Sequence, residues 1–224
     1  MRLLVKKIPL WFLALCCSLL VLLTNCQGQF DNVKNLKTAA GQQVIVLGDS
    51  ITAGYGVAEE EAYPVLLSQQ LGIPILNRGV SGDTTADGLA RLQSDVLDEN
   101  PWMVIVGLGG NDFLQKLPKT ETEQNLRTMT NAIQDEGAIV VLLGMNLGLL
   151  KDTYKELYER VARDTGAFLI PQVLKGILDD SSRRQDDVIH PNPVGHAVLA
   201  RRIAEALKPL LETASWPPAL RKSQ

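Results

Sequence analysis

Residues 44–50 read Val44-Ile45-Val46-Leu47-Gly48-Asp49-Ser50, a short apolar run that passes directly into a turn. Four consecutive apolar residues followed by glycine and aspartate are typical of a strand that is buried on both faces. Further runs of this kind occupy residues 73–76, 103–108, 138–143 and 167–170. The sequence therefore predicts five strands, and a serine follows the first of them.

Segments with the helical spacing of apolar residues separate these runs. They lie at residues 59–71, 84–97, about 120–133, about 154–161 and 194–210. The third opens with Thr120 and Glu123 in the spacing of a capping box. Strands that alternate with amphipathic helices predict right-handed crossovers and a parallel sheet with helices on both faces. The expected fold class is therefore α/β, with a five-stranded parallel sheet.

The chain has 224 residues, which fits one domain of ordinary size. We assign residues 1–25 to an export signal, 26–42 to a polar tether, 43–212 to the folded domain and 213–224 to a C-terminal tail. The sequence contains no internal repeat and no sign of a second domain. It leaves the oligomeric state open and is compatible with a monomer.

The first 25 residues have the composition of an export signal: Arg2, Lys6 and Lys7 precede an uncharged apolar stretch at residues 8–24. Leu23-Thr24-Asn25-Cys26 resembles the processing site of bacterial lipoproteins, in which the cysteine becomes the lipidated first residue. Plain secretion and an uncleaved anchor stay open, because the apolar stretch reaches the lower length limit of a membrane-spanning helix. We therefore expect an exported protein, periplasmic or at the cell surface, held at the membrane by its N-terminal lipid or anchor.

The cysteine content argues against a domain stabilised by disulfides, and the charge argues against a nucleic-acid-binding protein. All three cysteines lie at residues 16, 17 and 26, so the chain from residue 27 onward forms no intrachain disulfide. Removal of residues 1–25 takes away three basic and no acidic residues, which changes the formal net charge from −3 to −6. No basic cluster remains beyond two short pairs, so nucleic acid is not expected as a partner.

Polar clusters follow the predicted strands. Ser50 follows the first strand, Ser81-Gly82-Asp83 the second, Gly109-Gly110-Asn111-Asp112 the third, and the segment 187–190 the fifth. In open α/β sheets, ligands bind beyond the carboxyl ends of the strands. These clusters are therefore predicted to form one site at one edge of the sheet.

Asp187 and His190 have the spacing of a histidine base and its carboxylate. A carboxylate three residues before a histidine can accept the imidazole Nδ1–H within one tight turn, which fixes the tautomer and leaves Nε2 free to take a proton. Ser50 is the expected source of that proton, because a serine hydroxyl is a weak nucleophile without a base. Asp186 could also supply the carboxylate, and Asp187 is preferred only on spacing.

Each cluster also has a structural interpretation. Glycine, asparagine and aspartate are ordinary turn residues, and Thr52 stands where the nucleophile elbow of α/β-hydrolases has its second glycine. A metal site from Asp186, Asp187, His190 and His196 lacks the usual two-histidine spacing. No Gly-Lys-Ser/Thr sequence is present, which excludes a phosphate loop. We expect His196 to be a surface or packing residue.

Taken together, the four blocks resemble those of the SGNH (GDSL) hydrolases, over about residues 44–210. Within that family the chain is most similar to the bacterial acyl-CoA thioesterase I, lysophospholipase and arylesterase group. The resemblance implies a three-layer α/β/α flavodoxin-like sandwich without metal or organic cofactor. It implies Ser50 as nucleophile, His190 as base and then acid, and Asp187 as orienting carboxylate. It also implies an oxyanion hole from the backbone N–H groups of Ser50 and Gly82 and the side chain of Asn111.

The implied function is hydrolysis of carboxylic ester or thioester bonds through an acyl-serine intermediate. Small-molecule or lipid acyl esters are the expected substrates, with lysophospholipids and aryl or short acyl esters favoured over acyl-CoA, which does not normally reach an exported enzyme. Phe113, Leu114 and Leu117 are candidate acyl contacts, although packing onto their own domain explains them equally well. The alternatives are a carbohydrate O-acetyl esterase and a catalytically silent surface protein that binds its ligand.

Overall fold

The computed structural model describes residues 30–145 and 154–221. Residues 1–32 are a separate unit, of which only the turn at residues 30–32 is described. From Val33 onward the chain builds a five-stranded sheet in the order β2-β1-β3-β4-β5, with every pair parallel. Its strands are β1 (Gln43–Gly48), β2 (Ile75–Gly79), β3 (Pro101–Gly107), β4 (Ile139–Leu143) and β5 (Phe168–Ile170). This order is that of flavodoxin-like folds, so the predicted fold class is confirmed.

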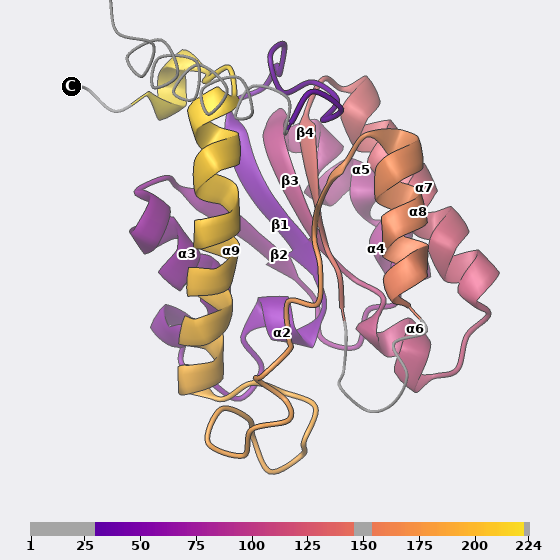
Figure 1. Cartoon of the computed structure of the whole chain (residues 1–224), viewed down its shortest axis with the longest axis vertical. Helices are drawn as coiled ribbons and strands as arrows, with labels where there is room; N and C mark the ends of the chain where they lie inside the picture. The colour runs from indigo at the N-terminus through magenta and orange to yellow at the C-terminus, as the bar shows by residue number, and fades with distance from the viewer. Residues whose placement is uncertain (1–29, 146–153, 222–224) are drawn as a thin grey trace, which may run out of the picture. The chain divides into compact units, whose positions relative to one another are not determined.

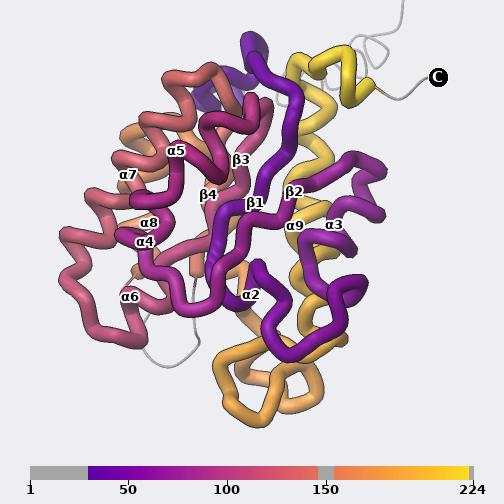
Figure 2. The backbone as a smooth tube through the Cα atoms, turned by 180° about the vertical axis from the view of Figure 1, so that it is seen from behind, coloured from indigo at the N-terminus to yellow at the C-terminus, as the bar shows by residue number. Residues whose placement is uncertain are grey.

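Helices cover the sheet on both faces and make the outer two of three layers (Figure 1). One layer holds α3 (Tyr63–Leu71) and α9 (Pro193–Thr213). The other holds α4 (Thr85–Ala90), α5 (Leu92–Asp95), α7 (Lys119–Asp135) and α8 (Lys155–Thr165). The view from behind shows the same division (Figure 2). Short elements complete the fold: α2 (Ser50–Ala53), α6 (Gly110–Leu114), and the 3₁₀ turns η1 (Glu59–Glu61), η2 (Leu97–Glu99) and η3 (Pro218–Leu220).

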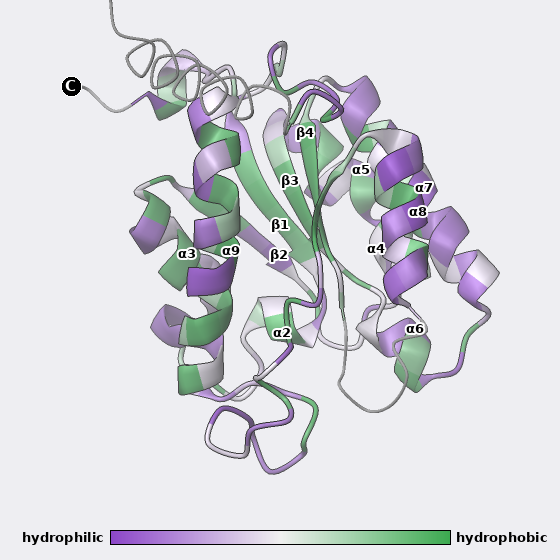
Figure 3. Cartoon of the chain, in the orientation of Figure 1, coloured by the Kyte–Doolittle hydropathy of each residue, from purple (hydrophilic) through white to green (hydrophobic). Residues whose placement is uncertain are grey.

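The core lies on the central strands. Every residue of β3 and β4 is buried, as is β1 after its first residue. Strands covered on both faces need apolar side chains on both, which is why they read as continuous apolar runs rather than as alternating patterns. Figure 3 shows these strands as hydrophobic and the outer helices as hydrophilic on part of their surface.

Several helix boundaries differ from the predicted ones. The segment predicted as one helix at residues 59–71 is the turn η1 followed by α3, which has Pro64 in its first turn, where the ring removes no needed N–H. The segment 84–97 is α4, α5 and η2, and it breaks at Arg91, whose backbone leaves the helical region. The strand predicted at residues 73–76 lies at Ile75–Gly79.

The predicted capping box at Thr120 and Glu123 is wrong. Helix α7 begins one residue earlier, at Lys119, and Pro118 precedes it without a side-chain cap. The ring of Pro118 fixes its φ, here −59°, so the chain enters the helix at a preset backbone angle, and no side chain caps the first turn. The reciprocal bonds of a capping box occur instead at Thr84 and Asp87, at the start of α4.

The stretches on either side of the folded domain make specific contacts with it. Asn35 donates to the carbonyl oxygens of Gln134 and Ala138, and Trp102 donates to the carbonyl of Ser215. The ring of Trp216 lies 4.9 Å from that of Trp102. Within the described residues, no helix combines the length and apolar character that a membrane span requires.

The strand order reverses its direction at β1. From β1 the chain first builds β2 on one side and later builds β3 on the other side. Ligand sites of doubly wound sheets lie outside the carboxyl ends of the strands at such a switch point. The segments that follow β1 and β3 are α2 and α6, and Figure 1 shows both at the carboxyl ends of the strands.

Candidate active site

Ser50 stands at the start of α2, immediately after β1. Asp49 is the N-cap of α2, and its Oδ1 accepts the N–H of Ile51 at 3.0 Å. The first N–H groups of a helix have no partner within it, so the Ser50 N–H is free of the helix ladder. The helix approaches β2 so closely that a Cβ at Gly79 would stand 2.2 Å from the Ala53 nitrogen. The serine is therefore held by a short, tightly packed turn.

His190 connects Ser50 to a carboxylate. Its Nε2 lies 2.8 Å from Ser50 Oγ, and its Nδ1 lies 2.6 Å from Asp187 Oδ2. Asp187 Oδ1 accepts the backbone N–H groups of Ile189 and His190, each at 3.1 Å. The local turn expected from the spacing is thus present, and Asp187, not Asp186, reaches the imidazole. Partial burial by itself raises the pKa of Asp187, but the hydrogen bonds from His190 and the two N–H groups outweigh it and hold the pKa below its usual value.

The loop that carries His190 is tied to the segment after α2. Gln185 makes this connection. Its backbone N–H donates to the His190 carbonyl, and its Nε2 donates to the carbonyls of Tyr55 and Pro191. The Tyr55 ring lies 4.7 Å from the His190 ring. Val188, in the middle of the turn, has a φ of 64°, a conformation that β-branched residues rarely adopt. The histidine is therefore placed by contacts on several sides.

The candidate oxyanion groups lie on two further loops. Gly82 has a φ of 92°, and a Cβ there would meet nothing within 4 Å. The backbone conformation, rather than lack of space, is therefore the reason for a glycine at this position. The Asn111 side chain donates one N–H to the Asp83 carbonyl at 2.9 Å. An amide nitrogen carries two hydrogens, so a second remains for a bound ligand.

Asp112 anchors the loop of Asn111 in the protein interior. Its side chain is buried and accepts the N–H and the hydroxyl of Thr85, the hydroxyl at 2.5 Å, and the hydroxyl of Thr122 at 3.0 Å. These bonds join α6 to the first residue of α4 and to α7. The sequence Asn111-Asp112 thus pairs one side chain at the site with one that fixes its backbone.

A cavity of about 180 Å³ opens beside Ser50. Leu114 lines it, whereas Phe113 packs edge-to-face on Tyr154 with ring centroids 5.5 Å apart. Leu117 is half-buried and is not among the lining residues of this cavity. The walls are formed by Asp49, Ser50, Ile51, Tyr55, Ser81, Gly82, Gly110, Asn111, Leu114, Ile189 and His190.

Two buried titratable groups have displaced pKa values. Burial raises the pKa of Asp49 to about 7, against the opposing effects of the Ile51 N–H and the nearby His190. Burial lowers the pKa of His196 to about 4. His196 is fully buried, and its Nδ1 accepts the N–H of Tyr63, so it is a packing residue and not a surface residue. In the part of the chain that the structure describes, no three His, Cys, Asp or Glu side chains gather as a metal site.

The sequence reasoning did not identify Tyr55, Asp49 or Ile189 as site residues. Tyr55 contacts His190, which is distant in the sequence, so no local pattern predicts that contact. Asp49 was available as part of the block Gly48-Asp49-Ser50, but its burial depends on tertiary packing. Ile189 adjoins the predicted histidine, and its exposure to the cavity follows from the turn at Val188.

Comparisons with known proteins give a consistent result. The model of the GDSL-like lipase/acylhydrolase family matches residues 46–198. The esterase TesA of Pseudomonas aeruginosa is 34% identical over 205 residues, which cover 87% of this chain and 96% of that protein. The thioesterase 1/protease 1/lysophospholipase L1 of Escherichia coli K12 is 31% identical over 182 residues, which cover 78% of this chain and 88% of that protein.

The structural comparison agrees. A crystal structure of TesA superposes with a TM-score of 0.71 at 33% identity, over 75% of this chain and 99% of that one. A weaker relative is the acetylxylan esterase of Geobacillus stearothermophilus, 27% identical over 207 residues, which cover 74% of this chain and 94% of that protein.

Proposed function

The chain belongs to the GDSL-like lipase/acylhydrolase family and is a serine esterase of that family, and on this premise we propose that Ser50, His190 and Asp187 carry out its reaction. The observation that supports this assignment best is the continuous relay from Asp187 Oδ2 through the imidazole to Ser50 Oγ, with spacings of 2.6 and 2.8 Å. Both distances are within hydrogen-bond range for a nucleophile, its base and the orienting group.

In the first half-reaction, Ser50 Oγ attacks the carbonyl carbon of the ester while His190 Nε2 takes the hydroxyl proton. The negative charge that develops on the carbonyl oxygen is met by the N–H groups of Ser50 and Gly82 and by Asn111 Nδ2. The tetrahedral intermediate collapses, the bond to the leaving group breaks, and His190 gives its proton to the departing oxygen or sulfur. The product is an acyl-Ser50 ester.

In the second half-reaction, a water molecule attacks the acyl-Ser50 carbonyl. His190 takes the water proton and later returns it to Ser50 Oγ, which leaves as the free hydroxyl, and the carboxylic acid departs. Asp187 stays ionised and stabilises the imidazolium that forms in both steps, in keeping with its lowered pKa.

Hydrolysis of p-nitrophenyl esters from acetyl to palmitoyl tests the assignment. Ser50→Ala is expected to lower kcat by about 10⁴-fold or more, while the thermal midpoint changes little because the hydroxyl adds no packing. Ser181→Ala, at an exposed serine far along the chain, is the matched control and should keep full activity. Equal activity of Ser50→Ala and wild type would show that another residue is the nucleophile. A fluorophosphonate probe that fails to label folded protein would favour the silent binding protein instead.

The size of the cavity favours short acyl groups. Ligand pockets for drug-sized molecules measure about 300–1,000 Å³, whereas the described cavity beside Ser50 measures about 180 Å³. We therefore propose small acyl or aryl esters as the preferred substrates, and a carbohydrate O-acetyl ester as the second candidate. A rate that peaks at acetyl or butyryl, with release of acetate from acetylated xylan, would support the second. A rate that rises up to palmitoyl would contradict both.

We also propose that the protein is exported and attached to the membrane through Cys26. The support is in the sequence: a basic start, an uncharged apolar stretch, and a cysteine followed by polar residues. Several fatty chains on one cysteine would anchor the protein firmly, whereas a single chain gives marginal binding. An experiment on Cys26 must distinguish this attachment from two alternatives, secretion without an anchor and retention of an uncleaved apolar segment.

A further inference from the structure

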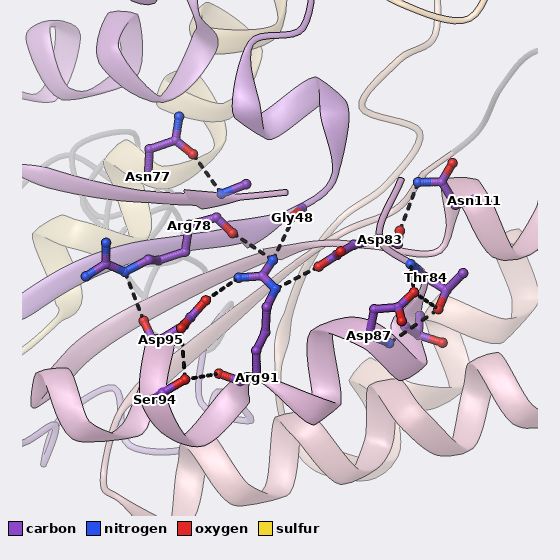
Figure 4. A network of polar contacts seen from close by, with 12 residues as sticks. Gly48, Asn77, Arg78, Asp83, Thr84, Asp87, Arg91, Ser94, Asp95 and Asn111 are labelled. Carbon is purple, nitrogen blue, oxygen red and sulfur yellow. Dashed lines mark hydrogen bonds and ion pairs between the residues drawn. The ribbon is translucent and has the colours of Figure 1, made fainter. Parts of the chain in front are cut away.

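Arg91 is the centre of a polar network beside the candidate oxyanion groups (Figure 4). It lies where α4 ends and α5 begins, and its side chain is only 17% exposed. Its Nε donates to Asp83 Oδ2 at 2.7 Å and its Nη1 to Asp95 Oδ2 at 2.8 Å. Its Nη2 donates to the carbonyls of Gly48 and Arg78, at 3.1 and 2.9 Å. One guanidinium thus binds four acceptors.

Three of these acceptors lie on segments that carry candidate oxyanion groups or lead into them. Gly48 ends β1, two residues before Ser50, and Arg78 is the next-to-last residue of β2, the strand that leads into the loop of Gly82. Asp83 directly follows Gly82, and its carbonyl accepts the Asn111 side chain. The Gly48 carbonyl also accepts the N–H of Val80, which joins the end of β1 to the same loop.

From these contacts we propose that Arg91 is a positioning residue, which fixes the relative placement of the Ser50, Gly82 and Asn111 donors. A planar guanidinium with five donors in a rigid fork can hold several acceptors in one arrangement, which an ammonium group cannot do. Oxyanion donors are effective only when they are already aimed at the place where charge develops. Arg91 does not touch the reacting atoms; it acts through Gly48, Arg78 and Asp83. This inference rests on the proposed function.

The network also contains a charge that could act in a different way. Asp83 carries a carboxylate beside the site, and its charge contributes to the raised pKa of Asp49. If Arg91 only neutralised this carboxylate, its loss would expose the oxyanion to a negative charge without moving any donor. Positioning and neutralisation therefore predict different results when both side chains are replaced.

The test compares Arg91→Met, Arg91→Lys and Arg127→Met with wild type, on p-nitrophenyl acetate. Arg127 is the matched control, because its side chain is also partly buried and pairs with two carboxylates, those of Glu123 and Asp164, outside the network of Arg91. Active sites are counted with a fluorophosphonate probe, so kcat refers to competent protein. A boronic acid that forms a tetrahedral adduct with a serine hydroxyl reports the binding of a transition-state analogue.

We expect kcat of Arg91→Met to fall about 10- to 100-fold. Complete removal of one oxyanion donor lowers kcat by roughly 10²- to 10³-fold, and a donor that is only displaced keeps part of its effect. KM should change little, and the inhibition constant of the boronic acid should rise by the factor by which kcat/KM falls. The kcat of Arg91→Lys should lie between those of wild type and Arg91→Met, and Arg127→Met should keep wild-type kcat. A double variant with Arg91→Met and Asp83→Asn should stay slow.

Several results would overturn the proposal. Recovery of kcat in the double variant would show that neutralisation, not positioning, is the role. A lower thermal midpoint with unchanged kcat per competent site would make Arg91 purely structural. If Arg91→Met does not fold, Arg91→Lys and Asp83→Ala provide the test. Asp83→Ala removes the carboxylate next to Gly82 that accepts from Arg91. Normal kcat in both variants would refute the inference. Retained activity in Ser50→Ala would instead refute the proposed function.

Discussion

Asp49 is the residue at which burial and charge conflict most directly. Its side chain is 3% exposed, and burial raises its pKa from 3.8 to about 7. The unfolded chain releases this proton near pH 4, whereas the folded protein holds it until about pH 7. As the pH rises through this window, the unfolded state gains relative to the folded state, so stability is lost. The gap between the two pKa values corresponds to at most about 4 kcal/mol.

We expect Asp49→Asn to be more stable than wild type at pH 8 and equally stable at pH 4. The amide oxygen can still accept the N–H of Ile51, but the side chain no longer ionises. Urea unfolding of both proteins at the two pH values measures the difference. Parallel stability profiles for wild type and variant would show that Asp49 is ionised in the folded protein at neutral pH.

At the scale of residues, the sequence was informative where a contact is local. Asp187 and His190 are three residues apart, so the turn that joins them follows from their spacing, and the structure contains it. The pairing of His190 with Ser50 spans 140 residues and came from the order of the strands and the family resemblance. Tyr55 and Arg91 could not be found in this way, because their partners are brought to them only by the packing of distant segments.

The joint between α3 and α9 depends on a buried imidazole. His196, in the first turn of α9, accepts the N–H of Tyr63, the first residue of α3, at 3.2 Å. That N–H has no partner within its own helix. Burial lowers the pKa of His196 from 6.5 to about 4, and the charge of His190 adds to this. Between pH 6.5 and about pH 4 the imidazole of His196 is protonated in the unfolded chain but not in the folded chain. The stability of the folded state that depends on the neutral imidazole is therefore lost as the pH falls.

We expect His196→Asn to reduce the loss of stability between pH 7 and pH 4.5. An asparagine oxygen can take the place of Nδ1 as acceptor, but it does not bind a proton, and the effect removed is at most about 3 kcal/mol. Urea unfolding at the two pH values gives the comparison with wild type. An unchanged difference would mean that His196 is protonated in the folded state. Asp49 acts in the opposite direction over an overlapping range, so only the single variants separate the two groups.

Element types were predicted better than element boundaries, and the reason is physical. Strands β1, β3 and β4 lie between two helical layers, so their sequences must be continuously apolar, and this signal is strong. Helix starts depend on one or two residues with competing preferences. Thr120 and Glu123 have the spacing of a capping box, but Pro118 starts the helix before them.

At the scale of the whole molecule, the alternation of strands and helices predicted the layers. The contacts of residues 33–42 and 214–221 with the domain were not predicted. Asn35 binds carbonyls near residue 135, and Ser215 binds Trp102, so these segments are held by partners about 100 residues away. Composition showed only that residues 26–42 are polar and that the tail cannot continue a helix. The roles assigned to the site residues stay predictions until variants are measured.

The attachment of the protein to a membrane is tested on the full chain, expressed in a bacterial host that is fed a clickable palmitate analogue. We expect the wild-type chain to carry the label and to sediment with membranes, and Cys26→Ser to lose the label. Cys17→Ser, at a cysteine within the apolar stretch, is the matched control and should keep it. Esterase activity should be equal in all three, because residue 26 lies outside the matched family region at residues 46–198.

The alternatives give different patterns in the same experiment. Plain secretion predicts unlabelled protein in the soluble fraction for all three chains, because nothing then holds the domain at the membrane. An uncleaved anchor predicts unlabelled protein that stays in the membrane fraction whether or not Cys26 is present, since about 17 apolar residues can hold a chain without lipid. Label that persists in Cys26→Ser would place the lipid on another residue, and the lipoprotein interpretation of Leu23-Thr24-Asn25-Cys26 would then be wrong.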